Sequence, residues 1–129
     1  MTTGYVTALR NAQLDAITTA VGNAGKLRIY DGTRPATGGT ATNLLAEFTL
    51  GSPFAAAASS ATLSPTLPSN TTGLAAGTAT WFRITTSGGT AQIDGSVGTS
   101  GADCNLNTTT ISVGVTVAVT GFSIARGNP

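Results

Sequence analysis

Residues 78–97, TATWFRITTSGGTAQIDGSV, carry the clearest structural pattern in the chain. The first half is rich in aromatic and β-branched residues, and alternation along a strand places Trp81 and Phe82 on opposite faces. Ser87-Gly88-Gly89 is typical of a tight turn, and a second strand-like run follows it. We therefore predict a β-hairpin here, and this hairpin indicates a β fold.

Further strand-like runs lie on both sides of the hairpin. They share alternating or β-branched residues bounded by turn residues, and they cover residues 26–30, 44–50, 109–113 and 115–125. The last run is apolar or small on both faces, which predicts a central strand. Residues 33–43 predict an exposed, mobile polar loop, and residues 98–108 predict a loop or a short edge strand. With about seven strands, the expected fold is mainly β: an antiparallel, jelly-roll-like β-sandwich with one N-terminal helix.

That helix is predicted over residues 5–22. Leu14, Ile17 and Val21 recur at helical spacing, and Gly22-Asn23 or Gly25 is suited to end the helix, with Thr2 or Thr3 as the N-cap. Two interpretations remain open: the helix packs on its own sheet, or it is an arm that lies on a neighbouring subunit. Leu9, Leu14 and Ile17 are accordingly interface candidates.

The whole chain is short and poor in charge. It has 129 residues, no His, 9% charged residues and a net charge of +1, whereas soluble domains average about 25% charged residues. We expect one domain over residues 1–129, with the helix or arm at 5–22 and the strands and turns at 26–125. The chain has too few Lys and Arg residues for the basic surface that a nucleic-acid binder needs. No run of residues approaches the roughly 18 apolar residues of a membrane span. Neither a nucleic acid nor a membrane is an expected partner.

The sequence contains no catalytic signature. GxSxG, GxxxxGK[ST] and HExxH are all absent, so no enzyme activity, cofactor-binding residue or metal ligand is expected. Asp31 and Asp94 each precede a Gly, which favours a turn role over a paired-carboxylate site. Cys104 has no second Cys and no His beside it, so an inert thiol in a chain made in a cytosol is expected.

Three further residues are candidates for an interface: Arg34 in the polar loop, and Trp81 and Arg83 in the first hairpin strand. For Arg83 the sequence allows a stem packed over Trp81, an ion pair with Glu47 or Asp94, or a contact between subunits.

Three segments together resemble small β-rich virion structural proteins of tailed bacteriophages: LRIYDGTRPATGG (27–39), ATWFRITTSGGTAQIDGSVGTSGAD (79–103) and ISVGVTVAVTGFSIARG (111–127). Within that class the resemblance is best to a capsid decoration or cement protein. It implies a non-enzymatic protein, made in the host cytoplasm, that binds the capsid exterior of the virion. Its partners would be the major capsid protein and further copies of itself, as a dimer or trimer.

Two other functions remain open at this point. The chain could instead be a small tail, adaptor or baseplate protein, which the same resemblance also fits. It could also be a carbohydrate- or receptor-binding module, because jelly-roll sandwiches often serve that purpose, although fold alone does not establish function.

Overall fold

The predicted hairpin forms the middle of the main sheet. The computed structural model describes residues 3–126, in which β6 (Trp81–Thr85) pairs antiparallel with β7 (Ala91–Gly98). On its other side β6 pairs with β1 (Lys26–Tyr30), again antiparallel. All five residues of β6 are buried, as a strand flanked on both sides and covered on both faces should be. The hairpin prediction is confirmed.

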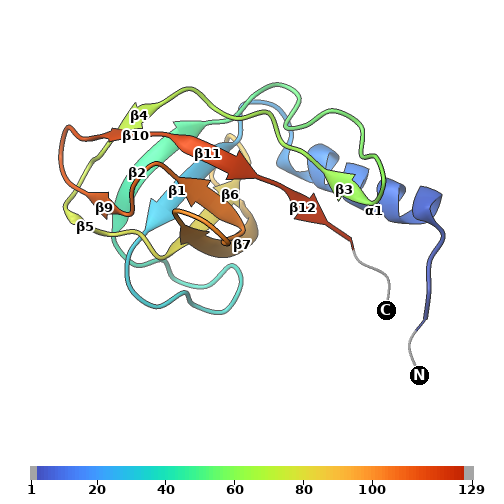
Figure 1. Cartoon of the computed structure of the whole chain (residues 1–129), viewed down its shortest axis with the longest axis horizontal. Helices are drawn as coiled ribbons and strands as arrows, with labels where there is room; N and C mark the ends of the chain where they lie inside the picture. Colours follow the sequence, from blue (N-terminus) through green and yellow to red (C-terminus); the bar gives the residue numbers. More distant parts are fainter. Residues whose placement is uncertain (1–2, 127–129) are drawn as a thin grey trace.

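The main sheet has six strands in the order β11-β8-β7-β6-β1-β2 and curls into a half-barrel (Figure 1). The remaining members are β2 (Leu44–Thr49), β8 (Cys104–Leu106) and β11 (Val119–Phe122). The chain is therefore mainly β with one helix.

Two long segments lie antiparallel to each other, and the second of them contributes its strand β11 to the main sheet. Residues 62–78 run alongside residues 110–125 and pair with them in three short ladders. Their strands are β3 (Thr62–Leu63), β4 (Thr71–Thr72), β5 (Gly77–Thr78), β9 (Thr110–Ile111), β10 (Thr116–Val117) and β12 (Ile124–Ala125). The segments reach both edges of the main sheet. At one edge the Leu74 N–H donates to the carbonyl of Leu45 in β2 at 2.8 Å, and at the other edge β11 pairs with β8. They thereby close the half-barrel around its core.

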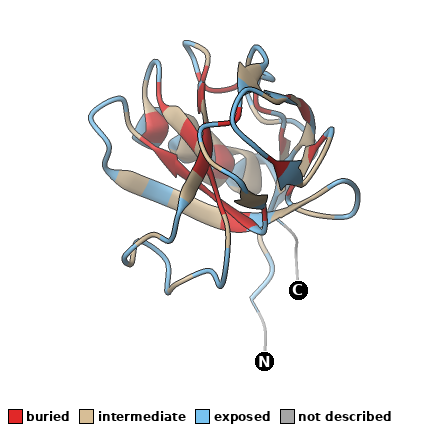
Figure 2. Ribbon diagram, turned by 90° about the vertical axis from the view of Figure 1, so that its left-hand side faces the viewer, coloured by how far each residue is buried: buried red, intermediate tan, exposed pale blue. Residues whose placement is uncertain are grey.

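The buried side chains form one continuous cluster that includes residues of the helix, the main sheet and the closing segments. Figure 2 shows the buried residues concentrated in the strands and the exposed ones in the loops. Leu27 and Ile29, the alternating pair of β1, are fully buried, as their shared face predicts.

The helix α1 (Thr7–Val21) is shorter than the predicted range. It starts after Val6 without a side-chain cap, so Thr3 does not cap it, and Thr2 lies outside the described residues. Gly22 ends it at a positive φ of 73°, with its N–H donating to Thr18 O at 3.1 Å. The predicted glycine stop is confirmed.

Polar side chains of α1 hold the backbone of the turn before β3. Asp15 Oδ1 accepts the Ala58 N–H at 2.7 Å, and Asn11 Oδ1 accepts the Ala61 N–H at 2.9 Å. Leu14 and Val21 are buried in the core cluster, and Ile17 packs against it. The helix therefore packs on its own chain, which is the first of the two interpretations.

This placement predicts a contrast between two leucines of α1. Leu14 is 2% exposed and Leu9 is 45% exposed. Leu14→Ala should lower the free energy of unfolding by about 2–5 kcal/mol through a buried cavity, and Leu9→Ala should change it by about 0.5 kcal/mol at most. Urea denaturation of both variants checks this, and equal effects would contradict the packing of α1.

The expected all-antiparallel arrangement is wrong at one pair. β8 lies inside the main sheet between β7 and β11, and it runs parallel to β7. Ser96 and Asp103 hold this connection together: the Asp103 carboxylate accepts the Ser96 N–H and hydroxyl, and Ser96 Oγ accepts the Asp103 N–H. Residues 98–108 are thus not an edge strand.

The long central strand expected at residues 115–125 is also wrong. It is broken into β10, β11 and β12, and β11 lies at the edge of the main sheet. Asn107 causes the first break, because its Oδ1 accepts the Ala118 N–H and its Nδ2 donates to Thr116 O. At Ala118 a side chain thus replaces a strand as hydrogen-bond partner. Residues 3–126 contain twelve strands, most of them short, where about seven were expected.

Candidate functional site

A row of four charged residues crosses the outer face of the main sheet. The strand register places Glu47 opposite Arg28, Arg28 opposite Arg83, and Arg83 opposite Asp94. The two guanidinium groups are neighbours, and each has a carboxylate on its far side: Arg28 Nε lies 2.8 Å from Glu47 Oε2, and Arg83 Nε lies 2.7 Å from Asp94 Oδ1. The flanking carboxylates offset the repulsion between the cations.

The two ion pairs differ in burial. The side chains of Arg28 and Glu47 are each 32% exposed, whereas those of Arg83 and Asp94 are 9% and 1% exposed. The buried pair is also bidentate, because Arg83 Nη2 donates to Asp94 Oδ2 at 2.9 Å. Breaking a buried pair leaves a charge without compensation, so this end of the row matters most for stability.

The pKa values follow from these contacts. Burial would raise the pKa of Asp94, but hydrogen bonds from Arg83 and from the Gly38 N–H outweigh it, together with the positive charges of Arg83 and Arg34, and hold that pKa below its ordinary value. The hydrogen bond to Asp94 raises the pKa of Arg83, and the hydrogen bond to Glu47 raises that of Arg28. These shifts favour the charged forms of Asp94, Arg83 and Arg28.

An aromatic stack lies beside the buried pair. The rings of Tyr30 and Trp81 are 4.4 Å apart and nearly parallel, and the Arg83 guanidinium lies 5.2 Å from the Trp81 ring centre. Trp81 Nε1 donates to Asp31 O and to Thr42 Oγ1, both at 3.0 Å. The stack thus joins the sheet to the two ends of the polar loop.

The loop at residues 33–43 is fixed to this face. Near its middle, the Gly38 N–H donates to Asp94 Oδ2 at 2.9 Å. At its base, the Asp31 carboxylate accepts the backbone N–H of Asn43 at 3.0 Å and its side-chain amide at 3.2 Å. Most of the loop is exposed, as predicted. Its hydrogen bonds at the base and the middle attach it to the main sheet, which holds it in a defined position.

The sequence candidates on this face divide between support and surface. Trp81 is 1% exposed and Arg83 is 7% exposed, so both are covered within their own chain, whereas Arg34 is exposed on the loop. The predicted stacking of Arg83 on Trp81 and its pairing with Asp94 are confirmed, and Glu47 pairs with Arg28 instead.

The turn role predicted for the two aspartates holds for only one of them. Asp31 closes the loop base, but Asp94 lies within β7 and serves the ion pair. Arg28 and Tyr30 belong to this site but are not among the candidates from the sequence. Alternation along residues 26–30 places them on one strand face, but only the order of the strands shows which charges lie beside them.

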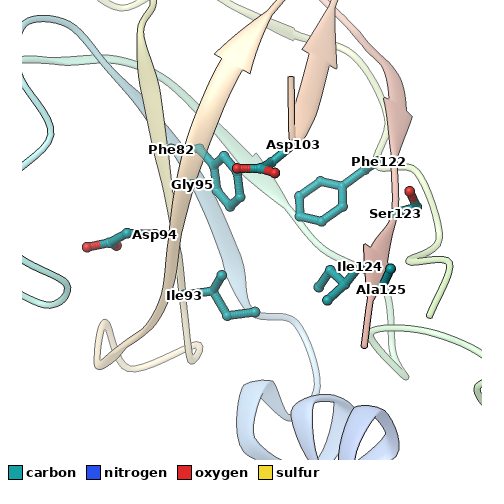
Figure 3. A pocket seen from close by; sticks show the side chains of 9 residues that line it. All are labelled: Phe82, Ile93, Asp94, Gly95, Asp103, Phe122, Ser123, Ile124 and Ala125. Carbon is teal, nitrogen blue, oxygen red and sulfur yellow. The ribbon is translucent and has the colours of Figure 1, made fainter. Parts of the chain in front are cut away.

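A second feature is a cleft of about 250 Å³ between β7 and β11–β12 (Figure 3). Phe82, Ile93, Phe122 and Ile124 give it an apolar lining, and the rings of Phe82 and Phe122 meet edge to face at 5.2 Å. The Asp103 carboxylate lies at the cleft, and Asp103 is an exposed residue. The Asp94 side chain, by contrast, points away from the cleft in Figure 3.

The helix candidates also differ in place. Leu14 belongs to the core, Ile17 is half-buried against it, and Leu9 faces solvent. Among the helix candidates, Leu9 thus has the side chain most open to a partner.

Cys104 is buried in the core. Burial raises the pKa of its thiol to about 12, and the neighbouring Asp103 carboxylate adds to the shift. We predict no alkylation by iodoacetamide at pH 8 in the folded chain and rapid alkylation in urea, because the thiolate is the reactive form. Mass spectrometry after timed exposure measures both rates, and rapid labelling of the folded chain would refute the burial of Cys104.

A scan against protein-family models found no matching family, and searches of the curated proteins and of the solved structures found no significant match. Within residues 3–126, no three His, Cys, Asp or Glu side chains gather as a metal-binding group. The single helix found in that range is too short and too polar to cross a membrane.

Proposed function

We propose that the chain is a structural virion protein of a tailed bacteriophage, a decoration or cement protein that binds the capsid exterior as an oligomer and stabilises it. The observation that carries the proposal is the loop at residues 33–43, which is exposed yet attached to the sheet by Asp94, Asp31 and Trp81. A loop held in this way loses little conformational entropy when it binds a partner.

The composition of the surface supports the same function. The chain has six basic and five acidic residues, and Arg28, Glu47, Arg83 and Asp94 pair among themselves. Short Thr, Ser, Ala and Gly side chains make up much of the loops. Covering such a surface removes few charges from water, so several faces can be buried with a small desolvation cost.

The stabilising mechanism is linkage. A protein that binds the assembled shell and not its separated subunits shifts the equilibrium toward the shell. Copies that also hold one another gain avidity from each further contact. In this proposal Arg34, exposed at the loop, contacts the major capsid protein.

The number of copies in purified particles tests the proposal. We expect an amount comparable to the major capsid protein by quantitative mass spectrometry, and a lower rupture temperature for particles stripped of the chain. A few copies per particle would replace the proposal with the tail, adaptor or baseplate alternative. Absence from particles would reject both.

Rebinding to stripped particles tests the loop. Arg34→Glu should reduce binding by about tenfold or more through lost charge complementarity. Lys26→Glu is the matched control, since it makes the same charge change on β1 outside the loop. Equal loss in both variants would show a general charge effect and would exclude the loop as the contact.

The carbohydrate- or receptor-binding alternative is less well supported. Tyr30 and Trp81 stack on each other and are 5% and 1% exposed, so neither ring offers an open face to a sugar.

The jelly-roll-like sandwich is also a proposal. In it, the curled main sheet is one layer, and the paired segments 62–78 and 110–125, which share β11 with that sheet, form the other.

A further inference from the structure

We propose that the apolar cleft between β7 and β11–β12 receives the start of α1 from a second copy of this chain, in a two-fold dimer. The inference deepens the oligomer part of the proposed function by naming the surfaces that meet.

The cleft has the size and lining of a site for apolar side chains. Its volume is about 250 Å³, and Phe82, Ile93, Phe122 and Ile124 line it. A cavity of about 150 Å³ lined by such residues is enough to hold benzene. The cleft is also open at the surface, since Ser123 and Ala125 at its rim are exposed (Figure 3).

The start of α1 presents side chains of the matching kind. Val6, the N-cap residue, is 72% exposed, and Leu9 in the first turn of α1 is 45% exposed. Two exposed apolar side chains so close in the chain mark an interaction surface more often than a scattered single residue does.

Charge complementarity selects this occupant. Asp103 at the cleft accepts hydrogen bonds from Ser96, and no cation lies within ion-pair distance of it in the described chain. Arg10 follows Leu9 and contacts Arg126 O and Thr7 Oγ1, without a carboxylate partner among residues 3–126. The acidic apolar cleft and the basic apolar helix start thus complement each other in both properties.

A two-fold axis satisfies both surfaces at once. In such an interface, each copy contributes its helix start to the cleft of the other, and the assembly closes at two copies. Three other large apolar residues of the described chain are exposed: Leu67 between β3 and β4, and Leu74 and Val113. Leu74 and Val113 form a pair in the β4–β5 and β9–β10 connections, at the far end of the long axis from the start of α1 (Figure 1). That pair therefore stays outside the dimer and supplies a control.

Sedimentation velocity of the isolated full chain tests the dimer. We expect wild type to sediment as a dimer, Leu9→Asp as a monomer, and Val113→Asp as a dimer. The control makes the same change at an exposed apolar residue, and circular dichroism checks that each variant folds. A monomeric wild type, a dimeric Leu9→Asp or a monomeric Val113→Asp would overturn the proposal without bearing on capsid binding.

Charge reversal on the helix tests the pairing itself. Arg10→Asp should raise the dimer dissociation constant by about tenfold or more, and Arg10→Lys, which keeps the positive charge, should raise it less. Circular dichroism checks that both variants fold. Equal weakening by the two variants, or no weakening by Arg10→Asp, would show that Arg10 does not meet a carboxylate across the dimer.

Discussion

Asp94→Ala is expected to lower the free energy of unfolding by about 3–5 kcal/mol, because it leaves the buried Arg83 guanidinium without its carboxylate. Asp94 is 1% exposed at its side chain and accepts hydrogen bonds from Arg83 and from the Gly38 N–H. The substitution removes all of these contacts in one step. Chemical denaturation with urea measures the loss.

Two controls separate burial from charge. Glu47→Ala breaks the other pair of the same row, which is 32% exposed at both side chains, and should cost about 1 kcal/mol or less. The double variant Arg83→Met with Asp94→Leu should be more stable than Asp94→Ala, since no unpaired charge remains. A loss for Asp94→Ala no larger than that for Glu47→Ala would contradict the account of the row.

The same pair sets a pH dependence. The folded-state pKa of Asp94 is lowered below its ordinary value, and the unfolded value is about 3.9. Its stabilisation is therefore fully present above about pH 5 and is lost as the pH falls through the unfolded-state and then the folded-state pKa. The stability difference between wild type and Asp94→Ala should be constant from neutral pH down to about pH 5 and shrink in stronger acid.

Trp81→Ala should cost about 3–5 kcal/mol, because it removes the largest buried side chain and leaves a cavity. The loss includes the stack on Tyr30, the contact with Arg83, and the two hydrogen bonds to the loop ends. Thermal and urea denaturation of the variant measure it.

Trp81→Phe is the matched comparison. It keeps an aromatic ring against Tyr30 but removes the indole N–H, so Asp31 O and Thr42 Oγ1 lose a donor. We expect a smaller loss of stability, and weaker rebinding to stripped particles if the loop is the capsid contact. A Trp81→Ala chain of wild-type stability that fails to assemble would move Trp81 from the support to an interface.

Local patterns in the sequence were good guides to local structure. Alternation at residues 26–30 predicted β1 and its buried Leu27 and Ile29, and the Gly pair after Ser87 predicted the hairpin turn. Helical spacing predicted the helix and its stripe of Leu14, Ile17 and Val21 but left open whether this stripe meets the chain's own core or a neighbouring subunit; Leu14 and Val21 lie in the core. These features depend on neighbours in sequence, which a single chain displays directly.

The remaining features depend on strand order and on side-chain hydrogen bonds, which alternation and helical spacing do not reveal. The parallel pairing of β8 requires the Ser96–Asp103 hydrogen bonds, and the break at Ala118 requires the side chain of Asn107. Both features depend on polar residues of the kinds that are common in loops, so the sequence does not single them out. The sequence predicted the row of charges in part. It named Asp94 and Glu47 as possible ion-pair partners of Arg83, and the order of the strands decides between them.

The turn before β3 joins the helix to the strand β12 and the residue after it. The Ala61 N–H donates to Asn11 Oδ1, the Arg126 N–H donates to Ala61 O, and Asp15 accepts the Ala58 N–H beside it. This junction therefore forms only after α1, the turn and β12 have all been synthesised. Pairings between segments so far apart in sequence slow folding, because loop-closure entropy is lost before the contacts form. The protein should thus complete this part of its native structure in a late step of folding rather than progressively from α1.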